Sequence, residues 1–294
     1  MSDRAALVSA ILNSPADDTP RLVFADWLDE HDEPERAEFV RCQIEAAKLP
    51  DDKRDESKPA KRAAALLEEH EKKWRGAAGL PGDNGEYARG FVDGVSAFPG
   101  ELAALGKALA VEPFTIHMRF GRRTETGADA TPEWFRALAA NPVLATVCSV
   151  DSETAGMGHE FLTPLVESPH LKNLEKITLF EDYIGPQGVQ ALADSPAPFV
   201  LKHLNLNSGI GYGEADDEDP ETVAAVEILA AHPRFASLTA LGLPFNSIGN
   251  RCAERLLASK TLARTLRLGL GEDNPFDRAY RDRLAARFNM VDYV

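Results

Sequence analysis

The sequence predicts an α/β solenoid joined to an N-terminal segment of helices, and two observations lead to this fold class. A spacing of apolar residues, L-x-x-[LI]-x-L with a polar or acidic position three residues later, recurs four times in the C-terminal half, with degenerate copies. The first 75 residues lack this repeat and carry helical patterns instead. Because a single strand-helix repeat cannot bury its apolar faces alone, the repeats are expected to stack into one continuous core.

The four copies align on their last leucines, Leu179, Leu206, Leu243 and Leu270, which are 27, 37 and 27 residues apart. An insertion of about ten residues explains the longer interval, since the acidic, glycine-containing segment 209–220 follows the second copy. The alternation of leucines within each copy predicts a short strand whose leucines point into the core.

Helical spacing follows these strands at Val189, Leu192 and Ala193, at Val223, Val226, Ile228 and Leu229, and at Cys252, Leu256 and Leu257. Earlier strands are expected near 91–95, 114–120 and 144–149, with helices over 101–110, 134–140 and 161–166. A last helix, 278–288, is expected to cap the C-terminal end, because terminal repeats cover an exposed core. The solenoid is therefore predicted over 90–294, with about six repeats of which the first three are irregular.

A strand and a helix at this period resemble the leucine-rich repeat, specifically its longer, ribonuclease-inhibitor-like type. The resemblance implies a parallel sheet on the concave face of the solenoid and helices on its convex face. Asp182, Asn246 and Asp273 stand where that family carries an asparagine whose side chain bonds backbone groups at the turn. Aspartate lacks the donor of that amide, so this ladder of bonds is expected to be incomplete.

The first 75 residues predict an all-α domain, with helices near 3–12, 19–31, 35–48 and 60–74 and a charged linker over about 50–59. The run from Asp18 to His31, followed by Pro34 to Arg41, resembles a repeat-companion domain that precedes repeat arrays in planctomycete bacteria. That resemblance implies a bacterial protein whose helical domain, 1–75, is followed by repeats. It implies no activity.

Composition narrows the classes of function. A formal net charge of -15 argues against nucleic acid as a partner, since phosphates would be repelled. The cluster Arg119, Arg122 and Arg123 is too small to offset that charge. Three widely spaced cysteines predict no disulfide framework and a reducing, cytoplasmic location. No apolar run approaches the roughly 18 residues that span a membrane, so no membrane partner is expected.

The motifs in the sequence predict no catalytic, cofactor-binding or metal-binding residues. His159 and Glu160 begin like a zinc-protease motif, but the second histidine is missing. The glycines of 209–213 precede a run of acidic residues, which would repel a phosphate. The acidic run fails as an EF-hand loop because position six would be Thr222 and position twelve Ile228. A loose divalent-cation site in this run stays open as an alternative.

The predicted binding site is the concave sheet face, where residues alternating with the buried leucines point to solvent. These candidates are Lys176, Thr178, Phe180, His203, Asn205, Asn207, Gly242, Pro244, Arg267 and Gly269. The sequence therefore predicts a non-enzymatic module that binds a protein partner, and the acidic loop favours a partner with a basic surface. One alternative is an enzyme or metal-dependent site between the helical domain and the first repeats. Another is a structural scaffold in which the helical domain serves as the N-terminal cap.

Overall fold

The computed structural model describes residues 3–15, 17–80, 85–121, 131–153, 158–211 and 219–292 of the 294-residue chain. The chain divides into two compact units. The first unit comprises Met1–Ala97 and Glu101–Ile116, and the second comprises Phe98–Gly100 and His117–Val294. The first unit extends beyond the expected helical domain of residues 1–75, since it includes most of the segment 91–116 that was assigned to the solenoid, and Phe91 packs in its core.

The first unit begins with helices that correspond to the four predicted helical segments. Its elements are α1 (Asp3–Asn13), α2 (Thr19–Glu30), α3 (Pro34–Ala47), α4 (Asp51–Arg54), α5 (Lys58–Ala78), β1 (Glu86–Ala88), β2 (Phe91–Asp93), β3 (Val95–Ala97) and α6 (Leu102–Ala108). The segment 50–59, expected to be a linker, contains α4 and the start of α5. The Ser57 hydroxyl accepts a hydrogen bond from the Ala60 N–H, and this bond caps α5 at its first turn.

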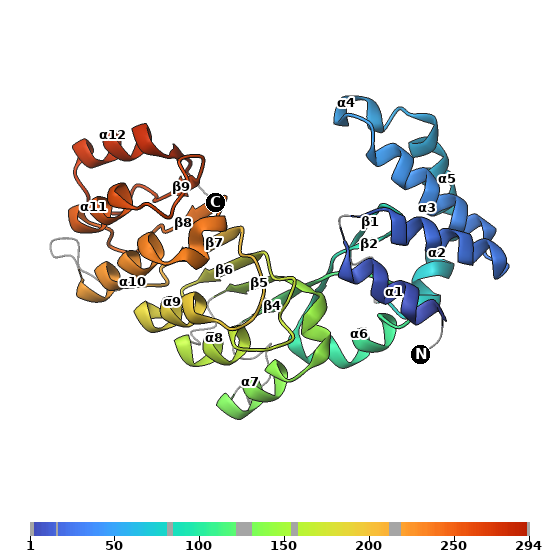
Figure 1. Cartoon of the computed structure of the whole chain (residues 1–294), viewed down its shortest axis with the longest axis horizontal. Coiled ribbons are helices and arrows are strands. Elements are labelled where there is room, and N and C mark those ends of the chain that lie inside the picture. The colour runs from blue at the N-terminus through green and yellow to red at the C-terminus, as the bar shows by residue number, and fades with distance from the viewer. Residues whose placement is uncertain are drawn as a thin grey trace. The chain divides into compact units, whose positions relative to one another are not determined.

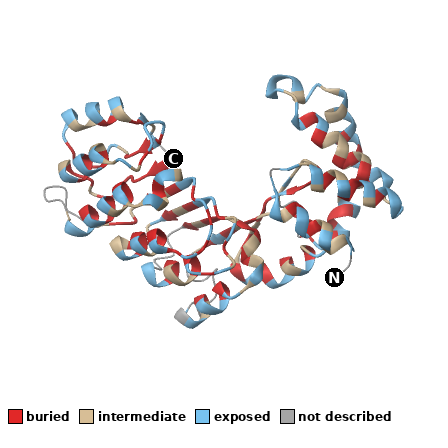
Figure 2. Ribbon diagram, in the orientation of Figure 1, coloured by how far each residue is buried: buried red, intermediate tan, exposed pale blue. Residues whose placement is uncertain are grey.

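Aromatic side chains organise the core of the first unit. Phe24 of α2 meets Phe91 of β2 edge to face, with ring centroids 5.5 Å apart. Phe39 of α3 packs against Trp74 of α5 at 5.1 Å, so the third and fourth predicted helices share one core. Strand β1 pairs antiparallel with β2, which places Ala88 opposite Phe91. Buried residues line the facing sides of these helices (Figure 2).

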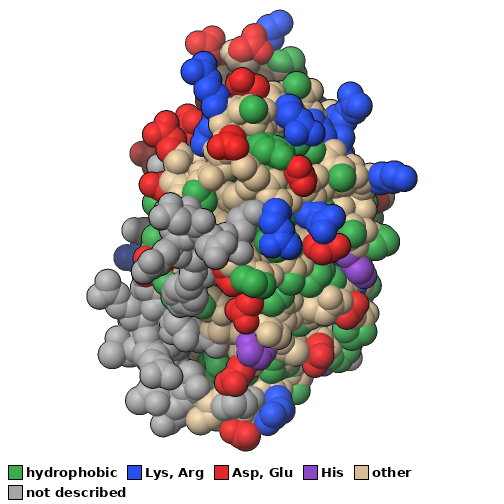
Figure 3. Space-filling view, turned by 90° about the vertical axis from the view of Figure 1, so that its left-hand side faces the viewer, with side chains coloured by type: hydrophobic (Ala, Val, Ile, Leu, Met, Phe, Trp, Pro, Cys, Tyr) green, Lys and Arg blue, Asp and Glu red, His purple; other side chains and the backbone are tan. Residues whose placement is uncertain are grey.

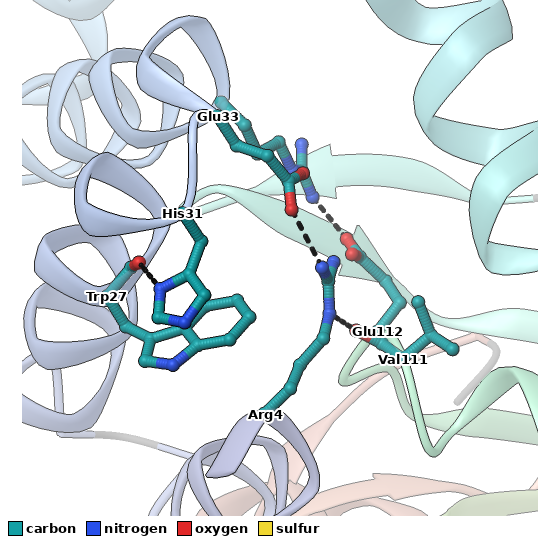
Figure 4. Close-up of polar contacts among 7 residues, drawn as sticks. Arg4, Trp27, His31, Glu33, Val111 and Glu112 are labelled. Carbon is teal, nitrogen blue, oxygen red and sulfur yellow. Dashed lines mark hydrogen bonds and ion pairs between the residues drawn. The ribbon is translucent and has the colours of Figure 1, made fainter. Parts of the chain in front are cut away.

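A buried ion pair joins α3 to the segment that follows α6. Arg36 donates a hydrogen bond to Glu112, and both side chains are at least nine-tenths buried. The Arg36 guanidinium also lies 4.7 Å from the centroid of the Trp74 ring. Figure 4 shows the neighbouring contacts, in which Arg4 of α1 bonds the Glu33 carboxylate at 2.8 Å and the Val111 carbonyl at 2.9 Å.

Burial raises the pKa of the Glu112 carboxyl above its ordinary value of 4.5, and the charge of Arg36 opposes this rise. Above pH 4.5 the folded chain therefore retains a proton that the unfolded chain releases, so rising pH lowers the free energy of unfolding. We expect this contribution to be complete below pH 4.5 and lost as the pH passes the raised pKa. The urea concentration at the unfolding midpoint, measured across this pH range, should fall more steeply with rising pH for the wild type than for Glu112→Gln. Equal slopes, or a midpoint difference that grows with pH in favour of the wild type, would contradict this expectation.

The second unit is a solenoid in which strands alternate with helices. Its elements are β4 (Ile116–Phe120), α7 (Pro132–Ala139), β5 (Val147–Glu153), α8 (Gly158–Val166), β6 (Lys176–Phe180), α9 (Gly185–Asp194), β7 (His203–Asn207), α10 (Pro220–Ala231), β8 (Ala240–Gly242), α11 (Asn250–Ala258), β9 (Arg267–Gly269), α12 (Arg278–Arg287) and β10 (Asn289–Met290). Helices α8 to α11 lie on one side of the strands, as Figure 1 shows. None of the described helices is long and apolar enough to cross a membrane.

The strands form one sheet in the order β10-β9-β8-β7-β6-β5-β4-β3. Neighbours from β5 to β10 pair in parallel, and their register places Leu179 opposite Leu206 and Leu241 opposite Leu268. These leucines are fully buried, so the repeat aligns one apolar layer across the sheet. The predicted fold class, a leucine-rich-repeat solenoid with a parallel sheet and helices on its other face, is confirmed.

The turns after the strands share one backbone conformation. Glu181, Ser208 and Phe245 stand at equivalent positions, and each has a positive φ, between 50° and 57°. The residue after Phe245 is Asn246, which is fully buried. Its side-chain oxygen Oδ1 accepts hydrogen bonds from the N–H groups of Gly209 and Ile210, at 2.8 and 3.0 Å. Its side-chain nitrogen Nδ2 donates to the backbone carbonyls of Leu206 and Pro244. Asn246 therefore plays the predicted turn-bonding role.

In the last turn this role belongs to Asn274, and the prediction for Asp273 was wrong. The side-chain oxygen Oδ1 of Asn274 accepts hydrogen bonds from the backbone N–H groups of Asn246 and Ile248, at 3.2 and 2.9 Å. Its amide donates to the carbonyls of Leu243 and Leu270, whereas Asp273 is exposed. The turn after Leu270 is one residue longer than the turn after Leu243, and this shift moves the bonding position from 273 to 274.

Candidate binding face

The outward-facing residues of the sheet form rows that run across the strands. Parallel register places Lys176, His203, Ala240 and Arg267 opposite one another in a first row. A second row contains Thr178, Asn205, Gly242 and Gly269, and a third pairs Phe180 with Asn207. The structure thus brings nine of the ten predicted residues into three rows. Pro244 lies just beyond the end of β8 and is buried, whereas it was expected to be exposed. Their role in binding stays a prediction.

The first row is the most exposed and carries positive charge. Lys176, His203 and Arg267 are all exposed at the starts of their strands. Lys176 lies 3.5 Å from the Asp151 carboxylate of β5. Just before these strands, Lys202 pairs with Glu175 at 2.6 Å on the same edge. Exposed pairs of this kind contribute little stability, so these side chains can exchange their partners at small cost.

The residues of the second row are less accessible to solvent toward the C-terminal repeats. Thr178 and Asn205 are half-buried, whereas Gly242 and Gly269 are buried. A Cβ atom at Gly242 would lie 2.9 Å from the Cγ atom of Asn205, so the Asn205 amide covers the glycine from the neighbouring strand. The expected bare strip is therefore partly filled by a neighbouring side chain, and glycine is needed at 242 to make room for it.

Exposed aromatic residues lie at the carboxyl ends of the strands. Phe180 closes β6 and is 37% exposed, as its alternation with Ile177 and Leu179 predicts. Phe245, in the turn after β8, is 49% exposed and was missed. Its outward orientation follows from the left-handed turn, which no pattern of apolar spacing reports. Only the repeated position of this turn, one residue before the bonding asparagine, could have indicated Phe245.

A chain of polar contacts crosses β4, β5 and β6 on this face. The Ser149 hydroxyl donates to Asp151 at 2.9 Å and lies 2.9 Å from Nδ1 of His117, and Asp151 faces Lys176. Whether His117 donates to Ser149 or accepts from it depends on the tautomer of the imidazole ring. These side chains link three neighbouring strands through polar contacts. The sequence analysis placed Lys176 on this face but missed His117, Ser149 and Asp151.

Metal-binding geometry is absent from the part of the chain that the structure describes, where no group of three or more His, Cys, Asp or Glu side chains could hold an ion. Most of the acidic insertion, residues 212–218, lies outside the described residues, as do Arg122 and Arg123. Asp219, near the end of the acidic run for which a cation site was left open, accepts hydrogen bonds from the N–H groups of Glu221 and Thr222. Its carboxylate therefore caps α10.

Charges are mixed over the end of the second unit near α10 to α12. Figure 3 shows acidic and basic side chains interspersed on this face, without a continuous field of basic residues.

Comparisons with known proteins do not assign the chain to a family. No protein-family model matches it, and no curated protein matches it. Among solved structures, it is similar to one described as the crystal structure of the Rad7 and Elc1 complex in yeast, at 12% sequence identity and a TM-score of 0.35. The match covers 98% of this chain and 64% of that chain. The chain thus spans less than two thirds of the length of that protein.

Proposed function

We propose that this chain is a non-enzymatic interaction module that binds a protein partner on the concave sheet face of its second unit. The observation that carries the proposal is that side chains lie in rows across the sheet, with two exposed phenylalanines, Phe180 and Phe245, near the carboxyl ends of the strands. Aromatic side chains that enter a partner's pocket supply much of the binding energy at protein interfaces. The exposed cations Lys176 and Arg267, at the opposite ends of the strands, would fix the direction in which the partner lies.

The solenoid supports this role because each repeat adds one strand to a continuous surface. The side chains that create the surface are not needed for the apolar layer, which consists of the alternate residues. The net charge of -15 favours a partner with a basic surface, since attraction between opposite charges speeds encounter.

The first unit, in this proposal, is a repeat-companion domain of the kind found in planctomycete bacteria. The residues that carry the resemblance, 18–31 and 34–41, form α2 and α3. Their apolar positions Phe24, Leu28 and Phe39 are fully buried. The similarity therefore includes residues that hold the unit together, as expected for a domain defined by its fold and not by a catalytic site.

The test compares Phe180→Ala/Phe245→Ala with the wild type. A partner captured from the source organism should be purified and its Kd measured by titration calorimetry. Loss of two aromatic anchors is expected to weaken binding by about 30-fold or more. Val200→Ala is the matched control, because Val200 is 55% exposed and precedes β7, away from the carboxyl ends of the strands. A double variant that binds within about twofold of wild type, or a control that loses as much affinity, would refute the proposal.

A further inference from the structure

The carboxyl end of the last repeats contains a cavity of about 460 Å³. Pro244 and Phe245 form one side of it, Leu270 and Met290 contribute apolar surface, and Arg281 of α12 lies on another side. Its size is within the range of small ligand-binding pockets. The candidate site described above includes Pro244 and Phe245, so the cavity adjoins the proposed binding face.

Gly271 keeps this cavity open. Its φ of +68° is left-handed, and a Cβ atom there would lie 3.2 Å from Cβ of Pro244 and 3.9 Å from a carboxylate oxygen of Asp273. Any side chain at 271 would therefore be strained and would occupy the space between the proline and the carboxylate. Glycine at this position therefore prevents a side chain from crowding Pro244 and Asp273, both of which line the cavity.

The cavity has an excess of negative charge. Glu272, Asp273 and Asp292 line it and are exposed, and among the described residues no ion pair involves any of the three. Arg281 is the one cation among the lining residues, and its guanidinium lies 3.4 Å from the Gly271 carbonyl and 4.9 Å from the ring centroid of Phe276. Three carboxylates and one guanidinium thus line the cavity.

We propose that this cavity binds an arginine side chain of the protein partner. The planar guanidinium suits both features of the cavity, since it bonds carboxylates through paired N–H groups and stacks on an aromatic ring such as that of Phe245. The aliphatic stem of the arginine would cover Leu270 and Met290. This inference deepens the proposed function and rests on it for the source of the arginine, whereas the cavity's preference for a guanidinium can be tested without any partner.

The experiment uses the full chain labelled with ¹³C at its methionine methyl groups. Met290 lines the cavity, and Met118 of β4 is fully buried and serves as the internal control. The probe is the capped peptide acetyl-Gly-Arg-Gly-amide, compared with the same peptide carrying citrulline, which has nearly the same shape without the charge. We expect the arginine peptide to shift the Met290 signal and to saturate it by about 10 mM, as fits a single weakly bound side chain. The Met118 signal should not move.

Charge variants complete the test. Asp273→Asn/Asp292→Asn should weaken the arginine peptide at least about fivefold, while Asp282→Asn, which removes an exposed charge from α12 outside the cavity, should change its Kd by less than about twofold. The inference is overturned if Met290 does not shift, if citrulline shifts it equally, or if Asp282→Asn weakens binding as much. If the arginine peptide binds but Phe180→Ala/Phe245→Ala keeps its affinity for the partner, only the proposed function is refuted. If the phenylalanine variant loses affinity but the arginine peptide does not bind, only the arginine cavity is refuted.

Discussion

Replacing Asn274 by alanine is expected to lower the free energy of unfolding of the second unit by about 3–5 kcal/mol. The side chain is 3% exposed and makes four hydrogen bonds to backbone groups of two successive turns. Alanine would leave two N–H groups and two carbonyls in the interior without these partners, and such groups are costly to bury. Urea denaturation followed by far-UV circular dichroism should show the loss, and amide exchange should quicken at Asn246 and Ile248.

The neighbouring residue provides the control for this prediction. Asp273→Ala removes an exposed side chain of similar size, and its effect should remain within about 0.5 kcal/mol. The pair of variants decides which residue bonds the last turn. If Asp273→Ala destabilises the chain as much as Asn274→Ala, the assignment of this role to Asn274 fails.

The substitution Arg36→Met should destabilise the first unit by about 3–5 kcal/mol, because it leaves the buried Glu112 carboxyl without its cation. The guanidinium is also close to the Trp74 ring, so aromatic contact is lost with the charge. Tryptophan fluorescence during urea unfolding is a direct measurement, since Trp74 lies in this core.

Two further variants show whether the unpaired carboxyl is the cause. Arg36→Met/Glu112→Leu removes both charges and should recover at least half of the loss, as apolar pairs often replace buried ion pairs without penalty. Arg41→Met makes the same change on the same helix, where Arg41 pairs with Asp26 and Asp29 in a largely exposed setting. Its cost should be below about 1 kcal/mol. A double variant no more stable than Arg36→Met would show that packing, and not charge, dominates.

Much of the candidate face could be predicted from the sequence because strand alternation has a fixed period. Once Leu204 and Leu206 are assigned to the core, His203, Asn205 and Asn207 must lie on the other face. Periodicity does not say how exposed each residue is. Gly242 lies on the predicted face yet is buried, because the Asn205 side chain from the next strand covers it.

Contacts between distant residues could not be predicted. Arg36 and Glu112 are 76 residues apart, and nothing in the local pattern around either residue indicates the other. The polar chain from His117 through Ser149 to Asp151 similarly depends on the register of neighbouring strands. The pattern of a single sequence shows which residues are apolar and how they are spaced. It does not indicate which polar side chains will be in contact in the folded chain.

Apolar spacing and the alternation of leucines were sufficient to predict the repeat, the parallel solenoid and the residues that form the three rows. The side chain that bonds the last turn, the exposure of Phe245 and the acidic cavity of the last repeats became apparent from the folded chain alone. These features depend on backbone conformation at single turn residues such as Gly271 and on side chains brought together from separate elements. Local spacing contains neither kind of information.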